Sequence, residues 1–149
     1  MEIRKAVSED IPKIFDNRIR FVSDFSKSEL SAEFIENTLN YLKENIGRDD
    51  FLAWLAFDND EIKSIVVMSI YKVLPTVTNI SGKHGLILNV WTHEDYRRQG
   101  LAYMLLKNII SEAKTKGVDR ISLKATDMGR LVYEKLGFED LSGEMALKI

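Results

Sequence analysis

The run Tyr-Arg-Arg-Gln-Gly-Leu-Ala at 96–102 has the residue types needed to bind a phosphate group. It lies between a strand-like apolar stretch at 86–92 and a helix-like stretch at 102–116. A small-residue turn that opens a helix leaves several backbone N–H groups unpaired, and the positive end of the helix dipole adds to their attraction for an anion. We therefore predict an anion cradle here, with Arg97 and Arg98 supplying charge for the phosphate oxygens.

Two common nucleotide-binding motifs do not match this run. A Walker A loop requires Gly, four residues and then Gly-Lys-Ser/Thr, and the sequence supplies neither the lysine nor the hydroxyl that holds magnesium. A Rossmann fingerprint requires a third small residue where Leu105 stands, and it usually follows an early strand rather than one in the second half of a chain. Another kind of phosphate-binding turn is therefore expected.

A second segment, at 131–138, reads Leu-Val-Tyr-Glu-Lys-Leu-Gly-Phe and follows the first by about thirty residues. The first segment resembles the Arg/Gln-x-x-Gly-x-Gly/Ala loop of the GNAT superfamily of N-acetyltransferases, and the second resembles the Leu-Tyr-x-Lys-Leu-Gly-Phe ending of that family. The resemblance covers about the last 65 residues in detail and the rest only in the order of elements. Two positions depart from the family pattern, with Glu94 in place of a proline and Thr126 in place of an asparagine.

The resemblance implies an α/β fold of the mixed, α+β type. Its central sheet is mostly antiparallel, contains one splayed parallel pair of strands and is flanked by helices. The resemblance also implies acetyl-CoA as cosubstrate, with the strand backbone at 90–92 bonded to the pantetheine arm and the main-chain N–H groups of 98–103 bonded to the pyrophosphate. The cofactor-binding residues expected on this basis are Val90, Trp91, Thr92, Arg97, Arg98, Gln99, Gly100, Leu101, Ala102 and Tyr103.

Tyr133 is the residue expected to act in catalysis, as the general acid. A phenol with an ordinary pKa of about 10 stays protonated at neutral pH and can give its proton to a departing thiolate. A strand N–H near Val90 or Trp91 would polarise the thioester carbonyl, so that an amine attacks it directly, in agreement with the absence of cysteine. The general base stays open, since Asn89 is a poor proton acceptor and Asp127 is expected to cap a helix.

The acceptor is expected to be a primary amine of a small molecule or a peptide, bound by the less patterned segments 18–50 and 76–83. Arg18 and Arg20 could hold an acidic group of this acceptor, but residues two apart on a helix point to different sides, so at most one is expected to contact it. One alternative is a noncatalytic acyl-CoA-binding or sensing domain. Another is an interaction module whose last strands pair with a second copy, which would make a homodimer.

The 149 residues, 45% of them hydrophobic, predict a single domain over 1–149. The net charge of −2 gives no reason to expect nucleic acid or an anionic membrane as a partner. No metal is expected, because cysteine is absent and His84 and His93 have no ligand-like spacing. A cytoplasmic protein is expected, since no stretch approaches the roughly 18 apolar residues of a membrane span and the first residues lack a signal-peptide pattern.

The elements that position these residues follow from hydrophobic spacing and turn residues. Strands are expected at 3–6, 51–57, 62–73, 86–92, 118–125 and within 138–149, and helices starting at Ser8–Asp10, running from Ser31 to Gly47, and at 102–116 and 128–136. The strand at 86–92 is nearly all apolar and is expected to be buried on both faces. The inner face of the helix at 102–116 is expected to comprise Leu101, Met104, Leu105, Ile109 and Ala113.

Overall fold

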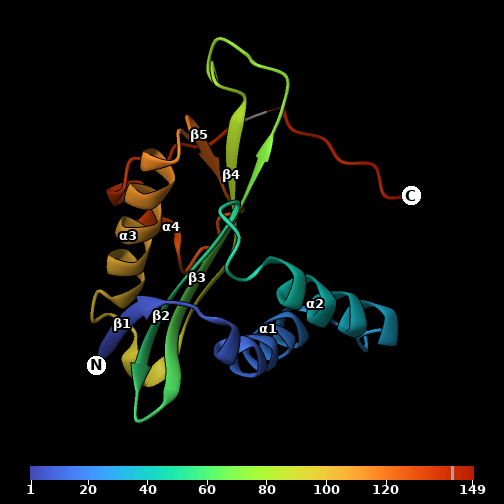
Figure 1. Ribbon diagram of the computed structural model, residues 1–149, viewed down its shortest axis with the longest axis vertical. Coiled ribbons are helices and arrows are strands. Elements are labelled where there is room, and N and C mark those ends of the chain that lie inside the picture. Colours follow the sequence, from blue (N-terminus) through green and yellow to red (C-terminus); the bar gives the residue numbers. More distant parts are fainter. Residues whose placement is uncertain (142) are drawn as a thin grey trace.

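The protein folds around one twisted sheet, seen in a computed structural model that describes residues 1–141 and 143–149 (Figure 1). The sheet has the strand order β1-β2-β3-β4-β5, with antiparallel neighbours except for the parallel pair β4 and β5. The elements are β1 (Glu2–Lys5), the 3-10 turn η1 (Ser8–Asp10), α1 (Ile11–Phe25), α2 (Ala32–Asn45), β2 (Phe51–Asp58), β3 (Glu61–Lys72), β4 (Lys83–Thr92), the 3-10 turn η2 (Glu94–Tyr96), α3 (Leu101–Thr115), β5 (Arg120–Ser122) and α4 (Arg130–Lys135). The mixed sheet flanked by helices, expected from the family resemblance, is confirmed.

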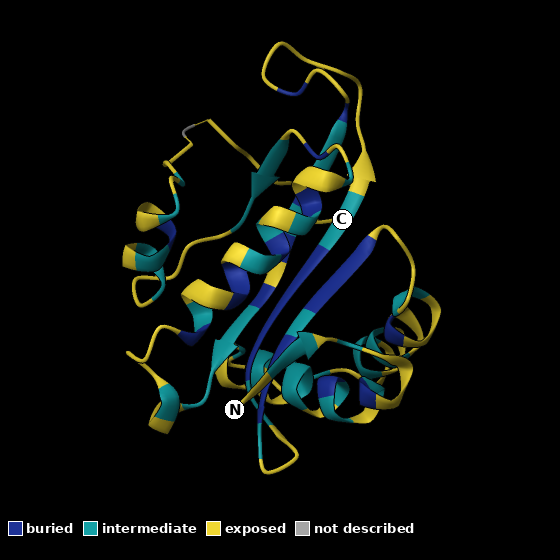
Figure 2. Cartoon of the chain, turned by 60° about the vertical axis from the view of Figure 1, so that its left-hand side comes forward, coloured by how far each residue is buried: buried dark blue, intermediate teal, exposed yellow. Residues whose placement is uncertain are grey.

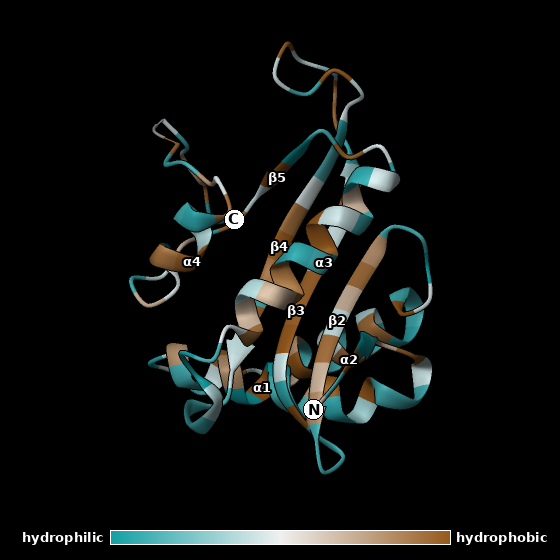
Figure 3. Cartoon of the chain, turned by 90° about the vertical axis from the view of Figure 1, so that its left-hand side faces the viewer, coloured by the Kyte–Doolittle hydropathy of each residue, from teal (hydrophilic) through white to brown (hydrophobic). Residues whose placement is uncertain are grey.

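Helices cover the two faces of the sheet separately, with α3 and α4 on one side and α1 and α2 on the other (Figure 1). The strand β2 contributes side chains to the hydrophobic cores on both faces of the sheet. Leu52 and Ala56 pack in the core beneath α3, whereas Leu55 and Phe57 pack in the core that also holds Ile14 of α1. Because successive side chains of a strand point to opposite faces, a strand with helices on both sides must be apolar throughout. Figure 3 shows these hydrophobic strands lying beneath α3.

The local signals at the helix ends are mostly confirmed. The Ser31 hydroxyl accepts a hydrogen bond from the Phe34 N–H, as expected of an N-cap, and Gly47 has a φ of +92° just past the end of α2. The expected start at Ser8 is wrong, because residues 8–10 form the short turn η1 and α1 begins only at Ile11. The cause is the Asp10 carboxylate, which accepts the Val7 N–H and thereby fixes a separate turn before the helix.

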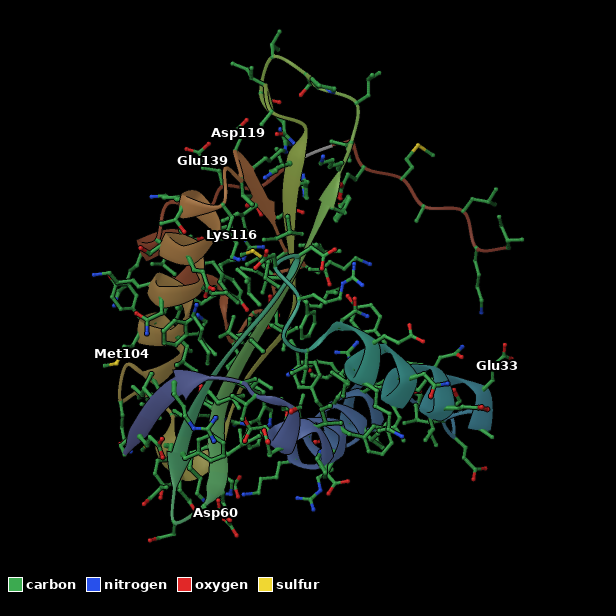
Figure 4. The ribbon with its side chains drawn as sticks, viewed as in Figure 1. Glu33, Asp60, Met104, Lys116, Asp119 and Glu139 are labelled. Carbon is green, nitrogen blue, oxygen red and sulfur yellow. The ribbon has the colours of Figure 1, made fainter. Side chains whose placement is uncertain are left out.

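Two expectations about burial are wrong. Leu88 of β4 is 46% exposed, because it is the extra residue at a register shift between β3 and β4 and so interrupts the alternation of the strand. Met104 of α3 is likewise 46% exposed and points away from the sheet (Figure 4), whereas Leu106 is fully buried. Four of the five residues expected on the inner face are buried as expected, with Leu106 in place of Met104, and Figure 2 shows this buried stripe facing the sheet.

The chain after α3 forms less sheet than expected. The strand expected at 118–125 is reduced to β5, three residues long. The helix expected at 128–136 is shorter, as α4, and the strands expected within 138–149 are absent from its described residues, 138–141 and 143–149; residue 142 lies outside them. β5 is therefore the edge of the sheet in the described part of the chain.

Candidate active site

The two parallel strands pair over only part of their length. The partners are His84 with Arg120, Gly85 with Ile121 and Leu86 with Ser122, and the rest of β4, 87–92, has no strand partner on that side among the described residues. The register between β3 and β4 also shifts at this point, so that Leu88 forms a bulge. On that side, the second half of β4 therefore offers a strand edge at which an extended ligand could pair as a strand would.

The turn before α3 presents a row of main-chain donors. None of the six N–H groups from Arg98 to Tyr103 donates a hydrogen bond to another described residue, whereas the next one, of Met104, binds the Gly100 carbonyl. Arg98 and Gly100 have φ values of +60° and +79°, which fold the backbone into a tight turn at the helix start. Such a turn directs consecutive N–H groups outward and suits a phosphate or pyrophosphate.

The turn is held in place by three side-chain contacts. The Tyr96 hydroxyl donates to the Asp58 carboxylate over 2.5 Å, and this hydrogen bond raises the pKa of the tyrosine. The Arg97 guanidinium donates to the Thr92 carbonyl over 3.1 Å, and the Gln99 amide donates to a carbonyl of the η2 turn over 3.0 Å. Arg97, expected as a phosphate ligand, is thus partly engaged with the protein's own backbone.

The side chains around the start of α3 differ in their exposure to solvent. Arg98 is exposed and makes no side-chain hydrogen bond to a described residue, so its charge is free for a ligand. The Tyr103 ring is 38% exposed and has the Lys107 ammonium 5.8 Å from its centroid. Leu101 is buried in the core beneath α3. The side chain of Leu101 therefore anchors the start of α3 in the core. Its main-chain N–H remains available to a ligand.

Tyr133 is fixed by the way α4 ends. The Phe138 N–H binds the Tyr133 carbonyl and the Gly137 N–H binds the Glu134 carbonyl, a Schellman ending that requires the φ of +94° found at Gly137. The Phe138 ring then packs edge-on against the Tyr133 ring, with centroids 6.0 Å apart. The Tyr-x-x-x-Gly-Phe spacing of the sequence is thus the signature of a helix end that positions the tyrosine.

Tyr133 is buried, but its hydroxyl forms no hydrogen bond within the described part of the chain. The residue is 6% exposed, and its hydroxyl makes no hydrogen bond to a described residue. Burial raises the pKa of Tyr133, because a phenolate would lose solvation there. Tyr133, Leu101 and Val90 belong to one core cluster beneath α3, whereas Trp91 packs in the cluster on the opposite face. The tyrosine therefore belongs to the same core as the start of α3 and the second half of β4.

Thr126, and not Asp127, accepts the hydrogen bonds of the turn that leads into α4. The Thr126 hydroxyl and carbonyl both accept the Gly129 N–H, over 3.2 and 3.1 Å, and the carbonyl also accepts the Arg130 N–H. Asp127 is exposed and makes no hydrogen bond to a described residue. The N-cap prediction for Asp127 is wrong, because α4 begins only at Arg130 and its N-cap is Gly129.

A polar cluster that sequence reasoning missed lies on the other face, at the bulge. Asn89 is only 3% exposed; its amide donates to the Asn17 side chain over 3.3 Å and its oxygen accepts from Arg18 over 3.1 Å. The same Arg18 nitrogen donates to the Leu88 carbonyl over 3.2 Å. Burial lowers the pKa of Arg18, and no described carboxylate forms an ion pair with it. The feature of the sequence that could have indicated this cluster is Asn89, a polar residue inside an otherwise apolar strand.

The two histidines do not form a common site. The His84 ring bonds to the Ser122 hydroxyl over 2.7 Å and joins β4 to β5, and burial lowers its pKa. The His93 ring accepts the Asp95 N–H at the start of η2. No group of three or more histidine, aspartate and glutamate side chains suited to a metal is present in the described part of the chain. In the same part, no helix has the length and apolar character needed to cross a membrane.

Comparisons with known proteins identify the family and the fold of the chain. The sequence profile of the acetyltransferase (GNAT) family matches residues 18–138. The chain is 30% identical over 101 residues to the uncharacterized N-acetyltransferase YsnE of Bacillus subtilis (strain 168), a match that covers 64% of this chain and 61%, less than two thirds, of that protein. It is 28% identical to a protein from Clostridium acetobutylicum described as a predicted acetyltransferase and crystallised with acetyl-CoA, with a TM-score of 0.89 over 99% of this chain and 95% of that chain. A GCN5-related N-acetyltransferase from Ralstonia eutropha JMP134 has the same fold, with a TM-score of 0.88 over 99% and 97% of the chains at 19% identity.

Proposed function

Because the chain belongs to the acetyltransferase (GNAT) family, we propose that it transfers an acetyl group from acetyl-CoA to a primary amine of a small molecule or a peptide. Residues 1–149 would form a single acetyltransferase domain. The observation that carries the proposal is the row of free N–H groups from Arg98 to Tyr103 beside the unpaired half of β4. Few other ligands need a pyrophosphate cradle and an extended strand-like arm at once.

The residues that would hold acetyl-CoA fit it in chemistry. The N–H groups of Arg98–Tyr103 would donate to the pyrophosphate, with the Arg98 guanidinium adding charge and Arg97 a weaker contribution. The main chain of Val90, Trp91 and Thr92 would bind the pantetheine arm along the open side of β4. Gly100 contributes its backbone conformation, since nothing lies within 4 Å of a Cβ built there and its φ is +79°.

Two groups would assist the transfer. A main-chain N–H near Val90 or Trp91 would donate to the thioester carbonyl oxygen and stabilise the charge that develops there. The amine nitrogen forms the new C–N bond while the C–S bond breaks, and Tyr133 gives its hydroxyl proton to the departing sulfur. The raised pKa of Tyr133 supports this role, because it keeps the proton on the phenol at neutral pH. The amine gives up its own proton to a base that we leave unassigned.

The acceptor would approach from the face that carries α1 and α2. The bulge of β4 is contacted from that face by Arg18, whereas Arg20 is exposed and makes no side-chain hydrogen bond to a described residue. Of the two arginines, Arg18 is therefore the candidate contact for an acceptor that carries an acidic group. Its lack of a carboxylate partner among the described residues supports this assignment.

Two measurements on one preparation test the proposal. Calorimetry with acetyl-CoA should give a binding isotherm, and release of free thiol should follow when amines, amino acids, aminoglycosides, polyamines or peptides with free N-termini are added. Binding without thiol release for every acceptor class would favour the noncatalytic acyl-CoA-binding domain. The absence of both binding and thiol release would overturn the proposal.

A further inference from the structure

A histidine and a serine lie together at the point where β4 and β5 cease to pair. Leu86 and Ser122 form the last pair of the two strands. The Ser122 hydroxyl is bonded to Nε2 of His84 over 2.7 Å, and the His84 ring packs against the Tyr71 ring with centroids 5.2 Å apart. His84 and Ser122 are both partly exposed. The two side chains therefore lie next to the open half of β4, along which the pantetheine arm is proposed to bind.

The two side chains point to the face of the sheet from which the acceptor would approach. Ile121 and Leu123, the neighbours of Ser122 in the chain, pack in the core beneath α3. Because successive side chains of a strand alternate between faces, the Ser122 hydroxyl points to the opposite face, on which α1 and α2 lie (Figure 1). The hydrogen bond places the His84 ring on that face as well. An amine that enters beside Arg18 thus arrives on the same side of the sheet as this pair.

The strands around this point carry no carboxylate. Residues 64–72 of β3, 83–92 of β4 and 120–122 of β5 contain neither aspartate nor glutamate. Their titratable side chains are those of lysine and arginine, the phenol of Tyr71 and the imidazole of His84. A lysine, arginine or tyrosine holds its proton at neutral pH, whereas a neutral imidazole accepts one. Among the side chains of these three segments, His84 is therefore the group that can act as a base.

The groups that surround His84 favour the neutral ring. Burial lowers the pKa of His84 below its ordinary value and the Arg120 charge lowers it further, whereas the Glu144 charge raises it. Tyr71 packs against the ring and is uncharged at neutral pH. In the neutral tautomer with its proton on Nδ1, the Nε2 atom of His84 accepts the hydroxyl proton of Ser122.

We propose that His84 takes up the proton of the acceptor amine through Ser122, an inference that rests on the acetyl transfer proposed above. As the amine nitrogen bonds to the acetyl carbon, its proton passes to the Ser122 oxygen, and the hydroxyl proton of Ser122 passes to Nε2 of His84. Tyr133 gives its own proton to the departing sulfur. The partly exposed imidazole then releases its proton to water, and water returns one to the phenol. Ser122 is thus the group that touches the amine, and His84 acts through it.

The tautomer of His84 provides a test that needs no acceptor. The chain has two histidines, so long-range proton–nitrogen correlation spectra of the labelled protein contain two imidazole patterns, and the spectrum of His84→Gln assigns them. At neutral pH we expect the His84 ring to be neutral, with its proton on Nδ1 and none on Nε2. A protonated ring, or a neutral ring with its proton on Nε2, would overturn the proposal, because Nε2 would then donate to Ser122 and could not accept its proton.

Kinetics of the two variants form the second test, with the amino acid or peptide amine that releases thiol fastest as the acceptor. His84→Gln and Ser122→Ala should each lower kcat by a factor of about 10², and the double variant should lose little more, because both groups act on one proton path. Ser69→Ala is the matched control, since this hydroxyl of β3 binds Tyr41 instead, and it should keep the parent kcat. Calorimetry should give the same acetyl-CoA affinity for all four variants.

The dependence of kcat on pH is the readout that a merely structural role of His84 would not change. The parent should lose activity in acid as the ring becomes protonated, with an inflection below the ordinary histidine pKa of about 6.5. His84→Gln should lack this inflection and keep only the one caused by the acceptor amine. An unchanged inflection or an unchanged kcat in His84→Gln would overturn the proton path alone. A parent protein that releases no thiol with any acceptor would overturn the proposed function, and the proton path with it.

Discussion

The hydroxyl oxygen of Tyr133 lies only 2.9 Å from the position that a Cβ atom would take at Gly129, and the ring carbon Cε2 lies 2.7 Å from it. Gly129 has an ordinary φ of −87°, so its backbone conformation does not require glycine. What requires glycine is the space taken by the phenol. This glycine therefore sets where the proposed proton donor sits, from four positions earlier in the chain.

Replacing Gly129 with alanine should displace the phenol without removing it. We expect kcat to fall at least tenfold, because a shift of the proton donor by part of an ångström is enough to misalign it with the departing sulfur. The affinity for acetyl-CoA, measured by calorimetry, should change little. Asp127→Ala, in the same turn but exposed, is the matched control and should keep the parent kcat. An unchanged kcat in the Gly129 variant would argue against Tyr133 as the donor.

Tyr133→Phe should remove the proton donor and keep the ring. We expect kcat to drop by a factor of about 10²–10⁴, the usual contribution of a general acid, with acetyl-CoA affinity nearly unchanged. Tyr96→Phe is the control at a tyrosine whose hydroxyl binds Asp58 instead. It should affect acetyl-CoA affinity through the turn more than it affects kcat. Equal losses of kcat in both variants would contradict a special role for Tyr133.

The raised pKa of Tyr133 also predicts a dependence of stability on pH. The unfolded phenol loses its proton at a pKa of about 10, whereas the folded one holds it to higher pH. The stabilisation is therefore fully present below pH of about 10 and is lost as the pH rises through the folded pKa. Melting temperatures of the parent protein should fall more steeply above this pH than those of Tyr133→Phe. Parallel curves would show that the buried phenol does not contribute.

Gly100 can be tested against a glycine with the same backbone conformation elsewhere. Gly100 and Gly47 have φ values of +79° and +92°, and nothing lies within 4 Å of a Cβ built at either position. Alanine at either should cost about 1–2 kcal/mol of unfolding free energy from left-handed strain alone. Only Gly100→Ala should weaken acetyl-CoA binding, because only that turn carries the row of free N–H groups. Equal affinities in the two variants would remove the turn from the binding site.

Arg18 is expected to select the acceptor. Arg18→Ala should raise KM for amines that carry a carboxylate by at least tenfold and leave KM for acetyl-CoA unchanged, whereas Arg20→Ala should change neither. Thiol release with paired acceptors, an amino acid and its amide, measures the effect. If the Arg18 variant loses the same factor with both members of the pair, the arginine supports the bulge of β4 through Leu88 and Asn89 and does not recognise the carboxylate.

The sequence was sufficient to predict features that depend on neighbours in the chain. The turn at Gly100 and the helix end at Gly137 both rest on a left-handed residue at a fixed spacing, and both are found where expected. The hairpin of β2 and β3 was predictable for the same reason. The splayed pair β4 and β5 was expected from the family resemblance, since three-residue pairing in a parallel sheet leaves no periodic signal.

Features that depend on distant contacts were not predictable in this way. The Arg18–Asn89 contact joins residues 71 positions apart, and nothing in either local sequence indicates it. On the inner face of α3, Leu106 is buried instead of the expected Met104, because both residues are apolar and only the position of the sheet decides which of them it covers.

The contact between Arg4 and Asp10 should contribute to the stability of the fold and not to activity. The guanidinium binds both oxygens of Asp10, over 2.7 and 3.0 Å, and stacks 4.5 Å from the centroid of the Phe57 ring. The Arg4 hydrogen bond holds the pKa of Asp10 below its usual value. The carboxylate therefore stabilises the fold above its unfolded pKa of about 3.9, and this stabilisation is lost as the pH falls through the lower folded pKa.

Asp10→Asn should therefore destabilise the protein at neutral pH. We expect a loss of about 2 kcal/mol, less than the roughly 3–5 kcal/mol of a fully buried pair, because the Arg4 side chain is 35% exposed and partly screened by solvent. Asp50→Asn, which breaks the exposed pair with Arg48, is the control and should cost at most about 0.5 kcal/mol. Urea unfolding of both variants at pH 7 measures the difference. The gap between the Asp10 variant and the parent should narrow in acid, and a gap that widened instead would mean that the carboxylate is not the stabilising form.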